Sequence, residues 1–131
     1  MNEIAFEEKR KHEREKLINF LRGYSLNRKL LVLDRYEKQF MKASSAEEML
    51  ISESSLARPR MYEVRNFIMS LDNSDEKLLL YYHFIKGESV EKCAELLKIS
   101  RRSAFRLKRR ALAFAGRKLE KYFEDQKNGV R

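Results

Sequence analysis

Apolar residues recur every three or four positions along most of the chain, with charged and polar residues between them. This spacing is typical of amphipathic α-helices, and it predicts helices over residues 3–24, 26–42, 60–71, 77–86, 90–97 and 101–123. Strand signals are scarce, because β-branched residues are few and no Asn-Gly or Asp-Gly pair separates two alternating apolar runs. We therefore expect an all-α protein, a helical bundle of about six helices.

The first predicted helix changes character along its length. Residues 7–16, EEKRKHEREK, contain no apolar side chain, but they do contain i, i+4 pairs of opposite charge such as Glu7 and Lys11. A solvated helix that extends off the body of the protein is the simplest interpretation of this stretch. The following apolar residues need cover from another element, namely Leu17, Ile18, Phe20, Leu21 and Tyr24.

Residues 1–59 are predicted to form an N-terminal helical segment, a helical hairpin followed by a connector. Gly23 is expected to end the first helix and Ser25 to cap the second, and a link this short favours an antiparallel pair. The buried candidates of the second helix are Leu30, Leu33, Tyr36, Phe40 and Met41. Residues 43–59 are rich in Ser, Ala and Glu, and both a short helical turn and a flexible connector are compatible with them.

Residues 60–131 are predicted to form a second domain. Within it, residues 77–86 are apolar around most of the helix circumference, so this helix is expected to be central and the most buried. Cap residues are predicted at the helix ends, namely Asn73 or Ser74, Gly87, Ser89 and Ser100.

The last two predicted helices are separated only by a short turn at Lys98 and Ile99. Two amphipathic helices joined in this way are typical of a helix-turn-helix, with Ile99 in the angle between them. The second helix has an apolar stripe that fixes its buried face, and this stripe consists of Ala104, Leu107, Ala111 and Phe114.

The charge of the chain is concentrated in this last helix and its approach. The net charge is +9, from 29 basic and 20 acidic residues. Between Lys98 and Lys121 there are ten basic residues and a single acid, Glu120, so this segment carries the whole excess. A charge excess confined to one helix is typical of a polyanion-binding site, which makes double-stranded DNA the expected partner.

The helix-turn-helix hypothesis assigns a role to nine of these ten basic residues and to two serines. The first turns of a recognition helix reach base edges, whereas later turns follow the backbone. The residues assigned to bases are Arg101, Arg102, Ser103 and Arg106, since Arg is the usual bidentate reader of guanine. The residues assigned to phosphates are Lys98, Ser100, Lys108, Arg109, Arg110, Arg117 and Lys118.

Residues 81–112, YYHFIKGESVEKCAELLKISRRSAFRLKRRAL, resemble region four of bacterial sigma factors, with a short helix, an Ile-Ser turn and a basic helix ending in Arg-Ala-Leu. The chain is more similar still to ArpU-type regulators of Gram-positive phages and prophages. In these, the serine is followed by aromatic and basic residues, an Ala-Leu pair and a second alanine, here Ser100, Phe105, Arg106, Lys108, Arg109, Arg110, Ala111, Leu112, Phe114 and Ala115. The resemblance implies a small activator of late phage or prophage genes. The sequence departs from the pattern at Ala104, where Val, Ile or Tyr is usual, and Phe105 is expected to supply the missing volume.

Other classes of protein find little support in the sequence. Cys93 is the single cysteine, so an internal disulfide is excluded, and we expect it to be a small core residue. With His12 and His83 as the only histidines, and no HExxH, CxxC, GxSxG or glycine-rich phosphate motif, we expect no metal, no cofactor and no enzyme activity. No apolar run approaches the roughly 18 residues that span a membrane. The N-terminus is too charged for a signal peptide, so a cytoplasmic location is expected.

Taken together, these features predict a sequence-specific DNA-binding transcription regulator. Two alternatives stay open: a small terminase-like subunit that recognises DNA and assembles, and a sigma-like factor whose basic helix docks on RNA polymerase. A homodimer through the apolar faces of the N-terminal helices is a further expectation, because a single helix-turn-helix reads only a few base pairs.

Overall fold

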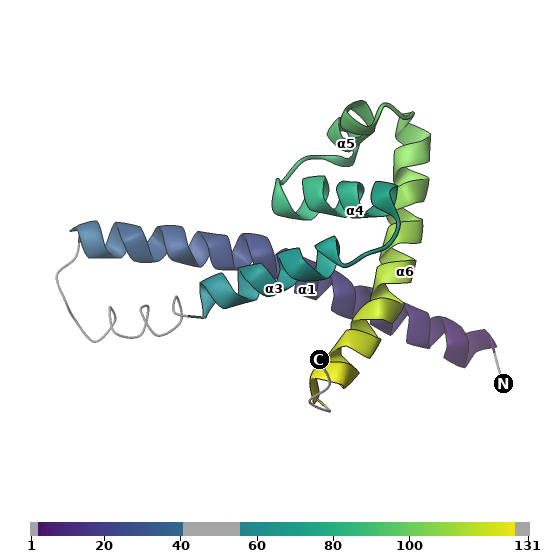
Figure 1. Ribbon diagram of the computed structural model, residues 1–131, viewed down its shortest axis with the longest axis horizontal. Coiled ribbons are helices and arrows are strands. Elements are labelled where there is room, and N and C mark those ends of the chain that lie inside the picture. Colours follow the sequence, from purple (N-terminus) through teal and green to yellow (C-terminus); the bar gives the residue numbers. More distant parts are fainter. Residues whose placement is uncertain (1–2, 41–55, 128–131) are drawn as a thin grey trace.

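The structure, a computed structural model, describes residues 3–40 and 56–127. The elements are helices α1 (Glu3–Phe40), α3 (Ala57–Met69), α4 (Ser74–Leu80), α5 (Val90–Leu97) and α6 (Arg101–Lys127), with a π-helical turn η1 (Tyr81–Ile85) directly after α4. No strand occurs in this part of the chain, which confirms the predicted all-α fold. Figure 1 shows α3 alongside α1, and α6 crossing α1.

The predicted N-terminal hairpin is wrong, because α1 is one continuous helix of 38 residues. Gly23 lies inside this helix, where its carbonyl accepts a hydrogen bond from the Asn27 Nδ2 at 2.7 Å. Asn27 is buried and α3 packs along this part of α1, so tertiary contacts offset the weak helix propensity of Gly23. Two predicted core residues are exposed as a result, Leu33 at 44% and Tyr36 at 58%. Met41 and residues 43–55 lie outside the described residues.

One apolar core joins α1 to the C-terminal half of the chain. Leu17 and Leu21 of α1 are fully buried, as the apolar second half of the predicted first helix requires. They belong to one cluster with residues of α3, α4, η1 and α6, which include Val64, Phe67, Ile68, Leu80, Ile85, Ala111, Leu112, Ala115 and Leu119. The division predicted at residue 59 therefore does not separate two cores.

Helix α3 begins at Ala57, so Pro59 lies within its first turn. Proline is tolerated there because the first N–H groups of a helix have no partner inside the helix. At the other end of the α3–α4 connection, Asn73 is the N-cap of α4, since its side chain accepts a hydrogen bond from the Glu76 N–H at 3.0 Å. The prediction of a cap at Asn73 or Ser74 is thus confirmed for Asn73.

The predicted helix at 77–86 divides into α4 and the π-helical turn η1. The Lys86 N–H donates to the Tyr81 carbonyl five residues back, at 3.1 Å. This segment was expected to be the most buried helix, but only part of it is fully buried. The side chains from Tyr81 to Phe84 are half-buried. Gly87 follows with a φ of +74°, which is the predicted conformation for a residue that ends a helix.

Candidate nucleic-acid interface

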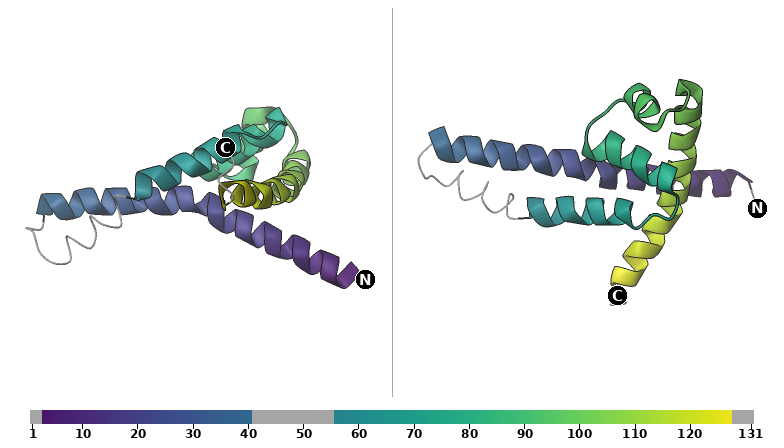
Figure 2. Two further views of the ribbon diagram at one scale, coloured as in Figure 1. Left: turned by 60° about the horizontal axis from the view of Figure 1, so that its bottom comes forward. Right: turned by 45° about the horizontal axis from the view of Figure 1, so that its top comes forward.

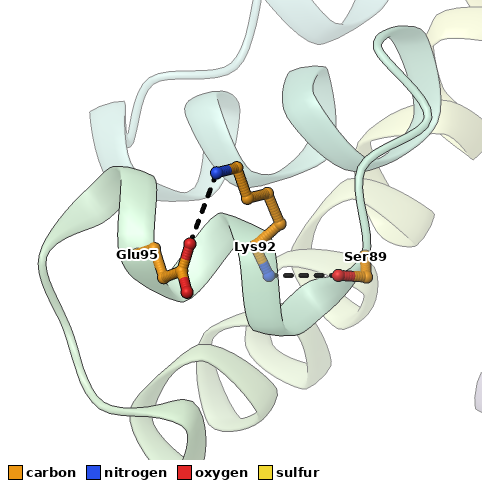
Figure 3. Close-up of polar contacts among 3 residues, drawn as sticks. All are labelled: Ser89, Lys92 and Glu95. Atoms are coloured by element: carbon orange, nitrogen blue, oxygen red, sulfur yellow. Dashed lines mark hydrogen bonds and ion pairs between the residues drawn. The ribbon is translucent and has the colours of Figure 1, made fainter.

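Helices α5 and α6 are joined by three residues, Lys98 to Ser100. Ser89 caps α5 as predicted, because its Oγ accepts a hydrogen bond from the Lys92 N–H at 3.1 Å (Figure 3). In the same turn, Lys92 Nζ lies 3.4 Å from Glu95 Oε2, also drawn in Figure 3. The helix ends where Lys98 adopts a left-handed conformation with φ +59°. The N–H of the following Ile99 donates a hydrogen bond to the Ala94 carbonyl at 3.0 Å. This reversal turns the chain sharply into α6.

Apolar side chains fill the space between α5 and α6. Ala104 is fully buried against Val90 and Ala94, and Leu107 packs against Cys93 and Leu79. Ile99 is half-buried and contacts both clusters, as predicted for a residue in the angle between the helices. The two helices therefore form one packed unit with α4.

Phe105 does not supply the volume that Ala104 lacks, so this expectation is wrong. The side chain of Phe105 is 42% exposed. At about 100° per residue it points away from the face that carries Ala104 and Leu107. Ala104 instead packs in one buried cluster with Val90 and Ala94 of α5, and Ile99 packs against this cluster.

Ser100 is the N-cap of α6, as predicted. Its Oγ accepts a hydrogen bond from the Ser103 N–H at 3.0 Å, and its carbonyl accepts one from the Ala104 N–H at 2.9 Å. The Ser100 and Ser103 hydroxyls also lie 2.9 Å from each other. Both serines are exposed, so the capped end of α6 faces solvent with two hydroxyl groups at its surface.

The exposed face of α6 carries a row of arginines. Arg102, Arg106 and Arg109 are exposed, and they follow the i, i+4, i+7 spacing of residues on one side of a helix. Arg117 continues the row two turns further on, with Ala113 between them. These side chains lie opposite the buried Ala104, Leu107 and Ala111, as the sequence predicts.

Three of the predicted basic contact residues bind groups outside α6. Arg101 Nη2 lies 3.7 Å from Glu91 Oε1, Arg110 Nε lies 3.3 Å from Glu76 Oε1, and Lys118 Nζ donates to the Ser70 carbonyl at 2.7 Å. The last two contacts tie α6 to the ends of α3 and α4. Of the remaining predicted residues, Lys98 is exposed and Lys108 is half-buried.

Phe114 does not belong to the buried stripe, which corrects another expectation. It is 61% exposed, and the guanidinium of Arg117 lies 5.3 Å from its ring centroid. Beyond Ala111 a different face of α6 is buried, the one that packs against α1. Leu112, Ala115 and Leu119 lie on this face, whereas Phe114 does not. The sequence contains these residues as a second stripe, but it does not show where one stripe replaces the other.

The buried titratable groups near this surface have altered proton affinities. Loss of solvent lowers the pKa of His83, whose Nδ1 lies 2.7 Å from the Glu88 carbonyl, and the nearby Lys108 and Arg22 act in the same direction. Burial raises the pKa of the Cys93 thiol, which keeps it protonated and poorly nucleophilic.

Neither a metal site nor a membrane span is found in residues 3–40 and 56–127. No group of three or more His, Cys, Asp or Glu side chains lies in positions to hold a metal ion. No helix there combines the length and the apolar character that crossing a membrane requires. Comparison of the chain with family models, with curated proteins and with solved structures found no match.

Proposed function

We propose that this protein is a sequence-specific DNA-binding transcription regulator in which α5, the Lys98–Ser100 connection and the first turns of α6 act as a helix-turn-helix. The observation that carries the proposal is the exposed row of Arg102, Arg106 and Arg109 on a helix whose N-terminus is capped and held by α5. Arg109 lies seven residues beyond Arg102, a rise of about 10.5 Å along the helix axis, so the row fits within the width of the major groove, which is about 12 Å.

The proposed roles follow the position of each side chain relative to the capped end. Base contacts are proposed for residues in the first two turns: Arg101, Arg102, Ser103 and Arg106. Phosphate contacts are proposed for Lys98, Ser100, Lys108, Arg109 and Arg117. For Arg110 and Lys118 we propose a structural role in place of a phosphate contact, because Arg110 pairs with the buried Glu76 carboxylate and Lys118 donates to the Ser70 carbonyl just after α3.

The finer proposal is activation of late genes of a phage or prophage. It is supported by the resemblance of the segment from Tyr81 onward to ArpU-type regulators and to sigma region four. An activator of this kind would place α6 on DNA beside RNA polymerase, so both partners are proposed.

Selection from a pool of random-sequence duplexes tests the central claim. A sequence-specific regulator should enrich one motif and bind it about 10³-fold or more tightly than random duplex at moderate salt. The enriched motif placed upstream of a weak promoter should then raise transcription when the protein is present. Binding without enrichment of any motif would contradict a sequence-specific regulator.

A further inference from the structure

Helix α1 crosses α6 on the side of the arginine row. The crossing is close at Gly116, where an added Cβ would lie 3.5 Å from the backbone oxygen of Glu13. Gly116 lies seven residues beyond Arg109, which is about two turns and about 10.5 Å along α6. The first part of α1 projects past α6 from this point, as Figures 1 and 2 both show.

The corner between the two helices is a basic hollow of about 160 Å³. Its lining residues come from both helices: Arg10, Glu13 and Arg14 of α1, and Leu112, Ala113, Gly116 and Arg117 of α6. Three arginines and one glutamate leave this corner with a net charge of +2. We call it the α1–α6 corner.

The basic character of the corner depends on which residues of α1 lie against α6 and not on the composition of α1. Residues 3–16 contain five basic and five acidic residues, so this stretch is neutral overall. Arg10 and Arg14 precede the buried Leu17 and Leu21 at helical spacing, so the two arginines lie on the side of α1 that faces α6. Glu8 and Glu15 lie at least about 100° further around the helix, whereas Glu3 and Glu7 share the arginine face but lie nearer the N-terminus and do not line the corner.

Two exposed phenylalanines hold arginines of the corner in place. The Arg10 guanidinium lies 4.2 Å from the Phe6 ring centroid, and that of Arg117 lies 5.3 Å from the Phe114 ring centroid. Phe6 is 56% and Phe114 is 61% exposed, so neither ring serves the core. The Arg117 Nε also donates to the Ala113 carbonyl at 3.5 Å, so the terminal Nη groups are the ones that a stacked Arg117 offers to phosphate oxygens.

We propose that the α1–α6 corner is a second DNA contact, in which Arg10 and Arg14 together with Arg117 bind the sugar–phosphate backbone flanking the groove that α6 enters. This inference rests on the proposed function. Arg106 and Arg117 are eleven residues, about 16 Å, apart along α6, which exceeds the major-groove width of about 12 Å. A groove centred on Arg106 ends about 6 Å along α6, near Arg110, so Arg117 and the corner lie about 10 Å beyond its edge, at the level of the flanking backbone and not inside the groove.

The test compares two charge-matched double variants on a mixed-sequence duplex of about 30 base pairs, with affinity measured over a range of salt concentrations. R10A/R14A removes two charges from the corner. R28A/K29A removes two exposed charges from the opposite half of α1, about 21 Å away along the helix. We expect R10A/R14A to lower the salt slope by about one unit or more and to weaken binding about threefold to tenfold, with R28A/K29A close to wild type.

Duplex length provides a readout that a structural role of these arginines would not affect. On a duplex of about 12 base pairs, just over one helical turn, R10A/R14A should bind like wild type because the flanking backbone is missing. R10K/R14K, which keeps both charges, should retain the salt slope on the long duplex. Equal affinities and slopes for R10A/R14A and R28A/K29A on the long duplex would overturn the inference, as would a defect of the same size on both duplexes.

The same experiment separates this inference from the proposed function. If R106A weakens binding to the selected sequence and R10A/R14A does not weaken binding to the long duplex, the function stands and the corner is not a DNA contact. If wild-type protein binds no duplex at any salt concentration, the proposed function fails and the inference fails with it.

Discussion

The Arg110 guanidinium lies 3.3 Å from the carboxylate of Glu76, whose side chain is only 8% exposed. This ion pair connects the N-terminal half of α6 to the first turn of α4, directly after the Asn73 cap. A carboxylate with so little access to water depends on its partner, because desolvation without a compensating charge is unfavourable. Arg110 therefore belongs to the framework that holds α6, although the sequence alone places it in a basic run.

The first prediction concerns this ion pair. Arg110→Ala should lower the free energy of unfolding by about 1–2 kcal/mol, because it leaves the buried Glu76 carboxylate without its cation. Urea denaturation followed by circular dichroism measures the change. Arg109→Ala is the matched control, since Arg109 is the adjacent exposed arginine, and it should leave stability within about 0.5 kcal/mol of wild type while weakening DNA binding. Equal stability of the two variants would show that the ion pair contributes nothing.

The second prediction tests the continuity of α1 at Gly23. In a continuous helix Gly23→Ala should raise stability by about 0.5–1 kcal/mol, because alanine restricts the unfolded chain more than glycine does. The added Cβ would meet only Asn27 Nδ2, at an ordinary contact distance of 3.8 Å. Gly87→Ala provides the contrast, since Gly87 has a φ of +74° and alanine there should destabilise by about 1 kcal/mol. A destabilised Gly23→Ala would support a helix that ends at Gly23.

The third prediction concerns pH. Burial lowers the pKa of His83 below its ordinary value of 6.5, so the folded state binds a proton less readily than the unfolded state. The associated stability is fully present above pH 6.5 and is lost as the pH falls through the lowered pKa. Melting temperatures should therefore decrease from about pH 7 to about pH 5, and His83→Gln should flatten this dependence. His12→Gln, at an exposed position on α1, should not; identical pH profiles of wild type and His83→Gln would contradict the assignment.

The sequence predicts the α5–α6 unit well because local signals determine it. Ser89 and Ser100 cap their helices, and Ile99 occupies the angle between them, all within a dozen residues of chain. The helical spacing of Ala104, Leu107 and Ala111 also predicts correctly which face of α6 is buried.

The features that the sequence does not predict depend on contacts between distant segments. Glycine is typical of a helix end, and the sequence does not show that α3 packs beside Gly23. Helical spacing indicates a buried Phe114, and the sequence does not show that α1 covers the next face of α6 instead. Lys118 looks like a free cation, but Ser70, 48 residues away, supplies its partner. Helical periodicity states which residues share a face, whereas the element that covers that face is a property of the tertiary structure.

The last prediction separates base reading from backbone binding along α6. Arg106 lies in the second turn, opposite the buried stripe, whereas Arg117 lies about three turns further on, beside Phe114. Arg106→Ala should cost about 1–3 kcal/mol on the selected sequence and little on random duplex, because it removes a base contact. Arg117→Ala should weaken binding to both duplexes by similar factors and lower the salt slope by about one unit.

Both side chains are exposed, so neither variant should change the melting temperature, and a loss of affinity can be assigned to the interface. The decisive quantity is the ratio of affinities for selected and random duplex, which should fall for Arg106→Ala and stay constant for Arg117→Ala. If the ratio stays constant for Arg106→Ala as well, Arg106 contacts the backbone. Helix α6 would then be rotated in the groove, and because Arg102 shares its face, the base contacts proposed for Arg101, Arg102 and Ser103 would also be wrong.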